Sequence, residues 1–293
     1  MNTPVLKLKG RAETVGGLPV NRLLPAVQQR AVGPFVFFVD HIGPAAFGAG
    51  QGINVPPHPH IGLATVTYLL EGEQLHRDSL GTEQLIYPGD INLMSAGRGI
   101  AHSERTPPSQ RNGGRIHGVQ TWLALPLSHE TSEPHFDHYP ASALPRFERD
   151  GVDVTVLIGQ LWQQQSPVRF PAETLYAVMR IPAGGQITIP AAATERALCL
   201  IEGDASLAGE PLDRGDLSVL QTGYEPSVTS AGGGTVLLLG GAPLDAPRHL
   251  WWNYVASRRE LIEAAKLAWQ EDRVGQVPNE TERLPLPIVR AHS

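Results

Sequence analysis

The chain has 293 residues, of which 41% are hydrophobic and 18% charged, so it can bury a sizeable core and is long enough for two domains. A net charge of −6 gives it no general attraction to nucleic acid or anionic membranes, and we expect neither as a direct partner. The single cysteine, Cys199, excludes an intramolecular disulfide and suits a reducing compartment. Met1 is not followed by an apolar leader, and no apolar run reaches the ~18 residues of a membrane span, so we expect a cytoplasmic protein.

The 31 glycines and 26 prolines favour many short strands joined by tight turns. Residues 5–30 are predicted to form an extended arm with one or two strands. Apolar, β-branched or aromatic segments follow at residues 33–44, 64–70, 84–87, 91–94 and 119–125, with turn residues between them. This spacing predicts an antiparallel jelly roll.

Two short Gly/Pro-rich runs contain potential metal ligands. His58 and His60 lie in the first run, and His102 and Glu104 lie in the second, about 40 residues later. Residues two apart on a strand point to the same face, so each run can direct both of its ligands into one cavity. A lone histidine is more often a surface or core residue, but three imidazoles and a carboxylate together suit a divalent transition metal that does chemistry.

The second half of the chain repeats patterns of the first half. Residues 187–190, 198–203 and 214–219 parallel residues 53–56, 68–72 and 88–93, respectively, which predicts two related barrels in tandem. The ligand run of the second copy is Ala191–Glu195 and contains no histidine. We therefore expect an N-terminal barrel with a metal site over residues 1–140, and a C-terminal barrel without metal ligands over residues 141–293. Residues 128–150 are predicted to be a solvated connector rather than a second metal cluster.

One helix is predicted near the C-terminus, within the second of these segments. Ser257 is expected as its N-cap, with Glu260 completing a capping box. An apolar stripe at helical spacing should pack against a barrel; its members are Leu261, Ala265, Ala268 and Trp269. The last ~15 residues are Pro-rich and charged, and are expected to lie along the surface or to be disordered.

Several of these motifs are long and ordered, and together they resemble the pirin family of the cupin superfamily from about residue 15 to residue 275. They are Phe35–Pro44, Pro57–Gly62, Thr67–Gly72, His76–Ser79, Pro88–Asp90, Ala96–Glu104, Gly241–Leu244 and Trp252–Asn253. The resemblance implies an all-β bicupin, that is, two tandem jelly-roll β-barrels with a short C-terminal helix.

The resemblance also implies one metal ion, usually iron, in the N-terminal barrel. It assigns the ligand roles to His58, His60, His102 and Glu104, the same four residues that the spacing selects. Fe(II) is the expected metal, with Ni, Cu, Co, Mn or Zn as possible replacements. Many pirins have Gly-Phe-Glu where this chain has Gly62-Leu63-Ala64. This departure removes bulk and an acid near the expected cavity, so it bears on substrate identity more than on chemistry.

Two functions are attached to the family. The first is that of a quercetin 2,3-dioxygenase, an oxidoreductase that opens a flavonol-like aromatic substrate with O2, and this is the function we expect. Glu104 is then the candidate general base for the substrate hydroxyl. The alternative is a non-enzymatic metal-binding regulator of transcription or metabolism that binds a protein partner. A metal-free structural bicupin is a third hypothesis, against which the intact ligand set argues.

Several other residues around the expected site are assigned supporting or structural roles. His76 is predicted either to orient a ligand or to be an exposed hairpin residue, whereas His41 and His117 are expected to be structural. Arg98 is expected to fix the glycine-rich turn by pairing with Asp90 or Asp78. Five apolar residues could line the cavity, although plain core is the simpler interpretation of each: Leu69, Ile91, Leu93, Met94 and Trp122.

Overall fold

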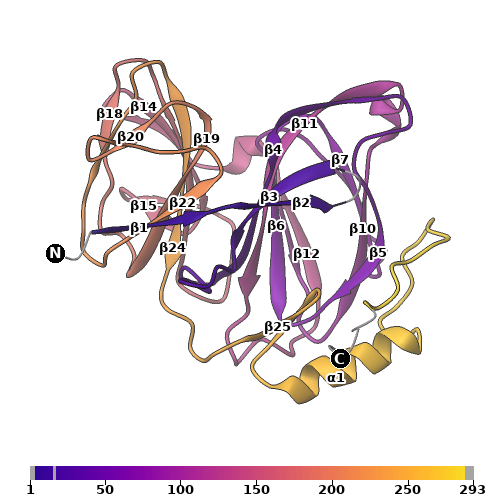
Figure 1. The fold of residues 1–293 in the computed structure, drawn as a ribbon. Helices are drawn as coiled ribbons and strands as arrows, with labels where there is room; N and C mark the ends of the chain where they lie inside the picture. Colours follow the sequence, from indigo (N-terminus) through magenta and orange to yellow (C-terminus); the bar gives the residue numbers. More distant parts are fainter. Residues whose placement is uncertain (1–3, 16–17, 288–293) are drawn as a thin grey trace, which may run out of the picture.

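The computed structural model describes residues 4–15 and 18–287, and it describes no side chain at residues 15–19 or 38–43. These residues form two jelly-roll barrels that lie side by side, each built from a seven-stranded and a four-stranded antiparallel sheet (Figure 1). The predicted bicupin fold is confirmed.

The first barrel is built from the first half of the chain. Its seven-stranded sheet has the order β12 (His135–Tyr139), β9 (Ile91–Ser95), β6 (Leu63–Glu71), β11 (Gly113–Ala124), β4 (Phe35–Gly48), β3 (Leu18–Leu24) and β2 (Arg11–Val15). Its four-stranded sheet has the order β5 (Asn54–His60), β10 (Ile100–Arg105), β7 (Gln74–Asp78) and β8 (Glu83–Ile86).

The second barrel repeats this order position by position. Its seven-stranded sheet runs β1 (Val5–Lys9), β22 (Asp216–Leu220), β19 (Glu195–Gly203), β24 (Gly234–Gly241), β17 (Thr174–Ile181), β14 (Val152–Ile158) and β13 (Arg146–Arg149). Its four-stranded sheet runs β18 (Gln186–Thr188), β23 (Ser227–Thr229), β20 (Ser206–Leu207) and β21 (Glu210–Pro211). The predicted repeat is therefore present in the sheet topology.

Smaller elements complete the chain. Two hairpins are formed by β15 (Gln160–Leu161) with β16 (Gln164–Gln165) and by β25 (His249–Trp251) with β26 (Tyr254–Ala256). Short 3₁₀ helices span Pro108–Gln110 and Ala141–Ala143, and α1 spans Arg259–Gln270.

The barrels pack through the outer faces of their seven-stranded sheets. Val66 and Tyr68 of β6 share one buried apolar cluster with Tyr176 and Val178 of β17. Alternate residues of a strand point to opposite faces, so the residues between them point into each barrel. Cys199 is also fully buried in this cluster.

The two barrel interiors differ in chemistry. Aliphatic side chains from both sheets fill the second barrel, among them Val156, Met179, Leu198, Val228 and Leu238. In the first barrel, buried polar side chains share the inward positions with apolar ones such as Leu69 and Trp122. The polar ones include Thr65, Thr67, Gln74, His76 and Gln120. Burying polar groups costs free energy unless they find partners, so a polar interior in one of two matching barrels indicates a functional site there.

The two ends of the chain cross between the barrels. β1 pairs with β22 and so extends the sheet of the second barrel, whereas β2 and β3 belong to the first. At the other end, α1 packs on the first barrel through a cluster that contains Ile61, Tyr254 and Ile262. The domain boundary at residue 140 stays a prediction. It divides the sequence, whereas β1 and α1 each pack with the barrel formed by the other part of the chain.

The connector and the helix start differ from the predictions. His135–Tyr139 is not solvated loop but an edge strand, because it pairs with β9. The helix begins at Arg259 with Arg258 as N-cap and without a side-chain cap. Ser257 is not the cap because its hydroxyl instead donates to buried Glu130, at 2.6 Å. The buried stripe of α1 is Ile262, Ala265 and Trp269, so only two of the four predicted members are fully buried.

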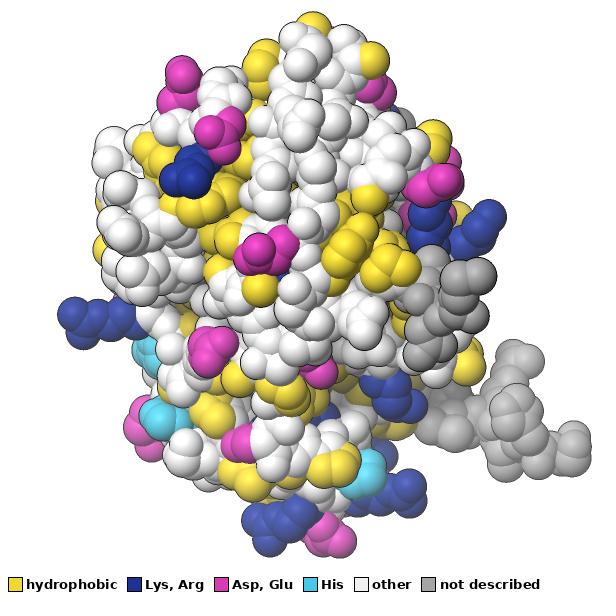
Figure 2. Space-filling view, turned by 90° about the vertical axis from the view of Figure 1, so that its left-hand side faces the viewer, with side chains coloured by type: hydrophobic (Ala, Val, Ile, Leu, Met, Phe, Trp, Pro, Cys, Tyr) yellow, Lys and Arg dark blue, Asp and Glu magenta, His cyan; other side chains and the backbone are white. Residues whose placement is uncertain are grey.

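Figure 2 shows the face that the second barrel presents. Acidic and basic side chains are scattered over it, with uncharged and hydrophobic side chains between them. On this face no patch of one charge sign stands out, in keeping with the net charge of −6. Within the described residues, no helix is long and apolar enough to cross a membrane.

Candidate metal centre

Three of the four predicted ligands converge inside the first barrel. His58 and His60 lie on β5, and His102 lies directly opposite His58 on the neighbouring strand β10. Ring nitrogens of the three imidazoles all lie within 4.8 Å of one another, and all three residues are buried. The spacing of two residues on a strand and the antiparallel register together bring the rings to one point.

The hydrogen bonds of the rings fix which nitrogen is available to a metal. His58 Nδ1 donates to Pro56 O at 2.9 Å, and His60 Nδ1 donates to Asn253 O at 3.0 Å. A carbonyl oxygen can only accept, so in a neutral ring the Nε2 atom keeps its lone pair. His58 and His60 are therefore held in the tautomer that a metal ligand requires.

His102 is held by a relay of two further residues. Buried Asp78 accepts a hydrogen bond from His76 Nε2 at 3.0 Å, so in a neutral His76 ring Nδ1 is an acceptor. His102 Nδ1 lies 3.4 Å from that atom and can donate to it, so that His102 Nε2 also keeps its lone pair. His76 is buried, so it is not an exposed hairpin residue, and its ring stacks on Phe136 at a centroid distance of 4.5 Å. Its place beside His102 suits the orienting role, which stays a proposal.

Burial sets the charge of the cluster. It lowers the pKa of His58, although the charge of Glu104 acts in the opposite direction, and it lowers the pKa of His60 and His102 well below the ordinary value of 6.5. For His60 and His102, the neighbouring imidazoles lower the pKa further. Neutral imidazole is the form that binds metal, so the site is prepared for binding at neutral pH.

The donor set fits a metal ion. His60 Nε2 and His102 Nε2 lie 3.1 Å apart, and both carry lone pairs in the tautomers fixed above. Two acceptors at that distance repel each other unless a cation or a proton lies between them, and burial disfavours the proton. A buried set of three imidazoles suits Fe, Ni, Cu, Co, Mn or Zn rather than Mg or Ca.

Glu104 lies close to the three histidines but outside their cluster. Its Oε1 atom accepts hydrogen bonds from Gln74 Nε2, at 2.9 Å, and from Gln120 Nε2. Glu104 pairs across the strands with His76, so it shares the inward face with the histidines. Its role as the fourth ligand stays a proposal.

Other predicted neighbours lie in different places. Trp122 contacts His60, with ring centroids 5.1 Å apart, and is thus a candidate wall residue. Ile91 and Leu93 belong to the apolar cluster between the barrels and are therefore core. Leu69 and Met94 instead lie on the inward face of the first barrel, because Met94 pairs with Thr65 and Leu69 alternates with it along β6, so both stay candidates for the cavity wall.

Two expectations about charged groups are wrong. Arg98 pairs with neither Asp90 nor Asp78, because it forms an exposed ion pair with Glu133 at 2.6 Å. Ala64 packs in the cluster between the barrels, so an acid at this position would face that interface and not the metal cavity.

Of the two histidines predicted to be structural, only His117 has a described side chain. His117 is buried, and its Nδ1 donates a hydrogen bond to Glu202 Oε1 of the second barrel at 3.0 Å, as expected for a structural residue. The side chain of His41 lies outside the described residues.

The residues that sequence reasoning missed are the partners of the ligands: Gln74, Asp78, Gln120 and Asn253. Gln74, His76 and Asp78 alternate along β7, so all three point inward. The same two-residue spacing that singled out the ligand pairs was therefore present here as a signal. The Asn253 carbonyl, 193 residues away from His60, carried no such signal.

Paired jelly rolls with a buried three-histidine cluster in one of them define a cupin with a candidate metal site. Residues 17–123 match the sequence model of Pirin, and residues 176–275 match that of the Pirin C-terminal cupin domain. The chain belongs to the pirin family.

Similar proteins align with most of the chain. It is 42% identical over 263 residues to a Pseudomonas aeruginosa protein named as a candidate quercetin 2,3-dioxygenase, covering 89% of this chain and 81% of the relative. It is 38% identical over 287 residues to a pirin-like protein of Caulobacter vibrioides, covering 96% and 99%. The crystal structure of a quercetin 2,3-dioxygenase from Acinetobacter baumannii superimposes with a TM-score of 0.92 at 34% identity, covering 99% of this chain and 97% of that one.

Proposed function

We propose that this protein is a metal-dependent dioxygenase of the quercetinase type, with iron as its metal, that opens a flavonol-like substrate with O2. The observation that carries the proposal is the cluster of His58, His60 and His102, with each ring prepared to present Nε2. The names of the Pseudomonas and Acinetobacter relatives support the type of reaction.

The three histidines would hold the ion, with Glu104 as the fourth ligand. When bound, the metal would lower the pKa of a coordinated hydroxyl and bring O2 and the substrate together. The Asn253 carbonyl and the His76–Asp78 relay would orient the rings, and Trp122 lies against the His60 ring.

Glu104 is the candidate base for the substrate hydroxyl. Its carboxylate would accept the hydroxyl proton, and the amides of Gln74 and Gln120 hold it in place by donating to Oε1.

The test is O2 uptake by iron-reconstituted protein of known metal content, with quercetin and without it. The proposal predicts that uptake depends on quercetin and is stoichiometric with its consumption. The His102→Ala variant, treated in the same way, should lose both bound iron and uptake.

Full iron loading without O2 uptake would contradict the proposed reaction. The family's other function, regulation through a protein partner, would then be the one to examine.

A further inference from the structure

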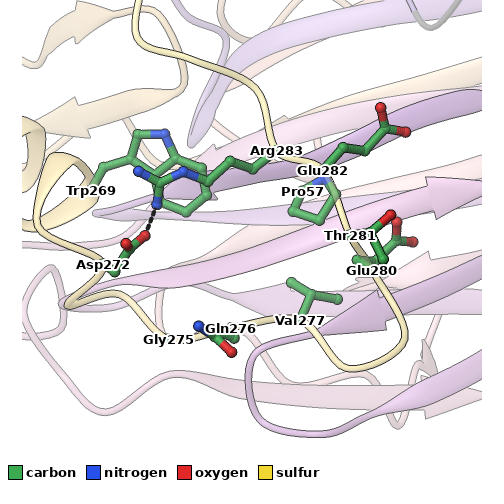
Figure 3. A pocket seen from close by; sticks show the side chains of 10 residues that line it. All are labelled: Pro57, Trp269, Asp272, Gly275, Gln276, Val277, Glu280, Thr281, Glu282 and Arg283. Carbon is green, nitrogen blue, oxygen red and sulfur yellow. Dashed lines mark hydrogen bonds and ion pairs between the residues drawn. The ribbon is translucent and has the colours of Figure 1, made fainter.

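A C-terminal strap, residues 271–287, follows α1 and lies across the outer surface of the four-stranded sheet of the first barrel (Figure 3). Two hydrogen bonds fasten its far part. Leu284 N donates to Pro57 O of β5 at 2.8 Å, and Trp269 Nε1 of α1 donates to Leu284 O at 2.9 Å. Val277 packs against Ala101 of β10 and Trp269. The strap therefore touches two of the strands that carry the histidines.

Glu280 is the charged anchor of the strap. Its side chain is only 7% exposed and lies between two arginines of neighbouring strands. Arg105 Nε of β10 donates to Oε1 at 3.1 Å, and a second nitrogen of the same guanidinium bonds Oε2. Arg77 Nη1 of β7 lies 3.6 Å from Oε1. One carboxylate thus joins β7 to β10 from outside the barrel.

The electrostatics of Glu280 agree with this geometry. Burial raises its pKa, but hydrogen bonds from Arg105 and the charges of both arginines outweigh burial, so the pKa lies below the ordinary carboxyl value. A carboxylate that is little exposed and bonded at both oxygens holds its partners in a defined geometry.

The arginines that Glu280 contacts alternate along β7 and β10 with residues of the candidate metal site. Arg77 lies between His76 and Asp78, and Arg105 directly follows Glu104. Because successive side chains of a strand point to opposite faces, the two arginines face outward where the site residues face inward. Pinning Arg77 and Arg105 to one carboxylate therefore also fixes the inward residues of β7 and β10 relative to each other.

The relative position of β7 and β10 determines the contact between His76 and His102. These rings belong to β7 and β10, and their nitrogens lie 3.4 Å apart, near the limit of a hydrogen bond. A small displacement of one strand along the other would break this bond. The orientation of His102 is thus sensitive to the register and spacing that Glu280 holds.

The strap is held by these polar anchors together with a few apolar contacts, those of Val277, Leu284 and Leu286. A cavity of about 240 Å³ lies along it, and its lining includes Pro57, Trp269, Gln276 and Arg283 (Figure 3). Removing one anchor should therefore change the position of the strap and the strands without removing apolar core.

We propose that Glu280 is a positioning residue of the metal centre, which acts through Arg77 and Arg105 to hold His102 against His76. This inference rests on the proposed function only in requiring that the histidine cluster binds a metal. The C-terminal strap then affects the geometry of the metal site without contributing a ligand to it.

The test compares Glu280→Gln with Glu282→Gln in the full chain. Glu282 is the matched control because it lies on the same strap and contacts the same Arg105, at 3.1 Å, but is 60% exposed. Cu(II) is the probe, since it binds imidazole tightly and its EPR hyperfine coupling reports on the ligand arrangement. Affinity is measured by competition with a chelator, and the unfolding free energy of the metal-free proteins is measured in urea.

Glu280→Gln should shift the Cu(II) hyperfine coupling and weaken Cu(II) binding about tenfold, the low end of the effect of groups that support a ligand. Glu282→Gln should keep the wild-type spectrum and an affinity within about twofold, as expected for an exposed ion pair. Glu280→Asp keeps the charge but shortens the reach, and should shift the spectrum as well. It also serves as the comparison if Glu280→Gln does not fold.

A merely structural Glu280 would lower the unfolding free energy and leave the spectrum and affinity of the folded protein unchanged, which would overturn the inference. A wild-type protein that binds no Cu(II), Fe(II) or other transition metal would instead contradict the proposed function. The two failures are thus distinguishable.

Discussion

Replacing His76 by alanine tests how the partner of a ligand contributes to metal binding. The change removes the acceptor for His102 Nδ1 and the donor to Asp78, while the three clustered imidazoles remain. His102 can then rotate or adopt the other tautomer, in which Nε2 carries the proton. We expect metal affinity to fall and the fold to persist.

The magnitude follows from the two contacts of His76. Loss of a group that orients a ligand typically costs about 10–100-fold in metal affinity, and the long 3.4 Å contact places His76→Ala near tenfold, or about 1.4 kcal/mol. Asp78 still accepts backbone N–H bonds from Leu80 at 2.9 Å and Thr82 at 3.1 Å. The stability loss should therefore stay within about 1–3 kcal/mol.

The assay is a competition titration of the metal-free protein with Fe(II) or Ni(II) and a chromophoric chelator, alongside urea denaturation. His135→Ala is the matched control, because His135 and Asp137 form the same two-residue pair on β12 but are exposed, with nitrogen and oxygen 3.7 Å apart. Wild-type affinity in a folded His76→Ala protein would refute the relay.

Three further predictions concern the cluster itself. His58→Ala and His102→Ala should purify with substantially less metal than wild type, measured by elemental analysis, and equal metal content would disprove the ligand assignment. Glu104→Gln should keep much of its metal but lose O2 uptake, whereas full turnover would exclude Glu104 as the base. Because burial lowers the pKa of the clustered histidines below 6.5, the unfolded metal-free chain binds more protons than the folded one. Its stability should then be complete above pH 6.5 and fall at lower pH by up to about 1.4 kcal/mol per pH unit and histidine. Urea denaturation at pH 7.5 and 5.5 should show this loss, and His60→Ala should reduce it.

Local spacing explains why the histidines could be predicted. His58 and His60 need only a strand to point the same way, and the strand is specified by the residues around them. The pairing of His102 with His58 is tertiary, but two ligand pairs in one barrel leave few other arrangements. The repeat was predictable for a similar reason, since turns at matching intervals produce matching strands.

The partners of the ligands depend on contacts that no local pattern specifies. Glu104 receives amides from β7 and β11, and the register of those strands is set by the whole sheet. Serine is a common N-cap residue, yet the Ser257 hydroxyl instead donates to Glu130, 127 residues away. Arg98 likewise finds Glu133, which comes close to the glycine-rich turn only once the chain is folded.

The crossing of the chain ends has a consequence for how the two repeats can be separated. Cutting after residue 140 would deprive the second sheet of its edge strand β1, whose five residues pair with β22. It would also strip the first barrel of α1 and of the Asn253 carbonyl that orients His60. Each repeat thus carries a piece of the other, and neither is a transferable module. Because the two barrels exchange their ends, the candidate metal site draws on residues from both halves of the chain.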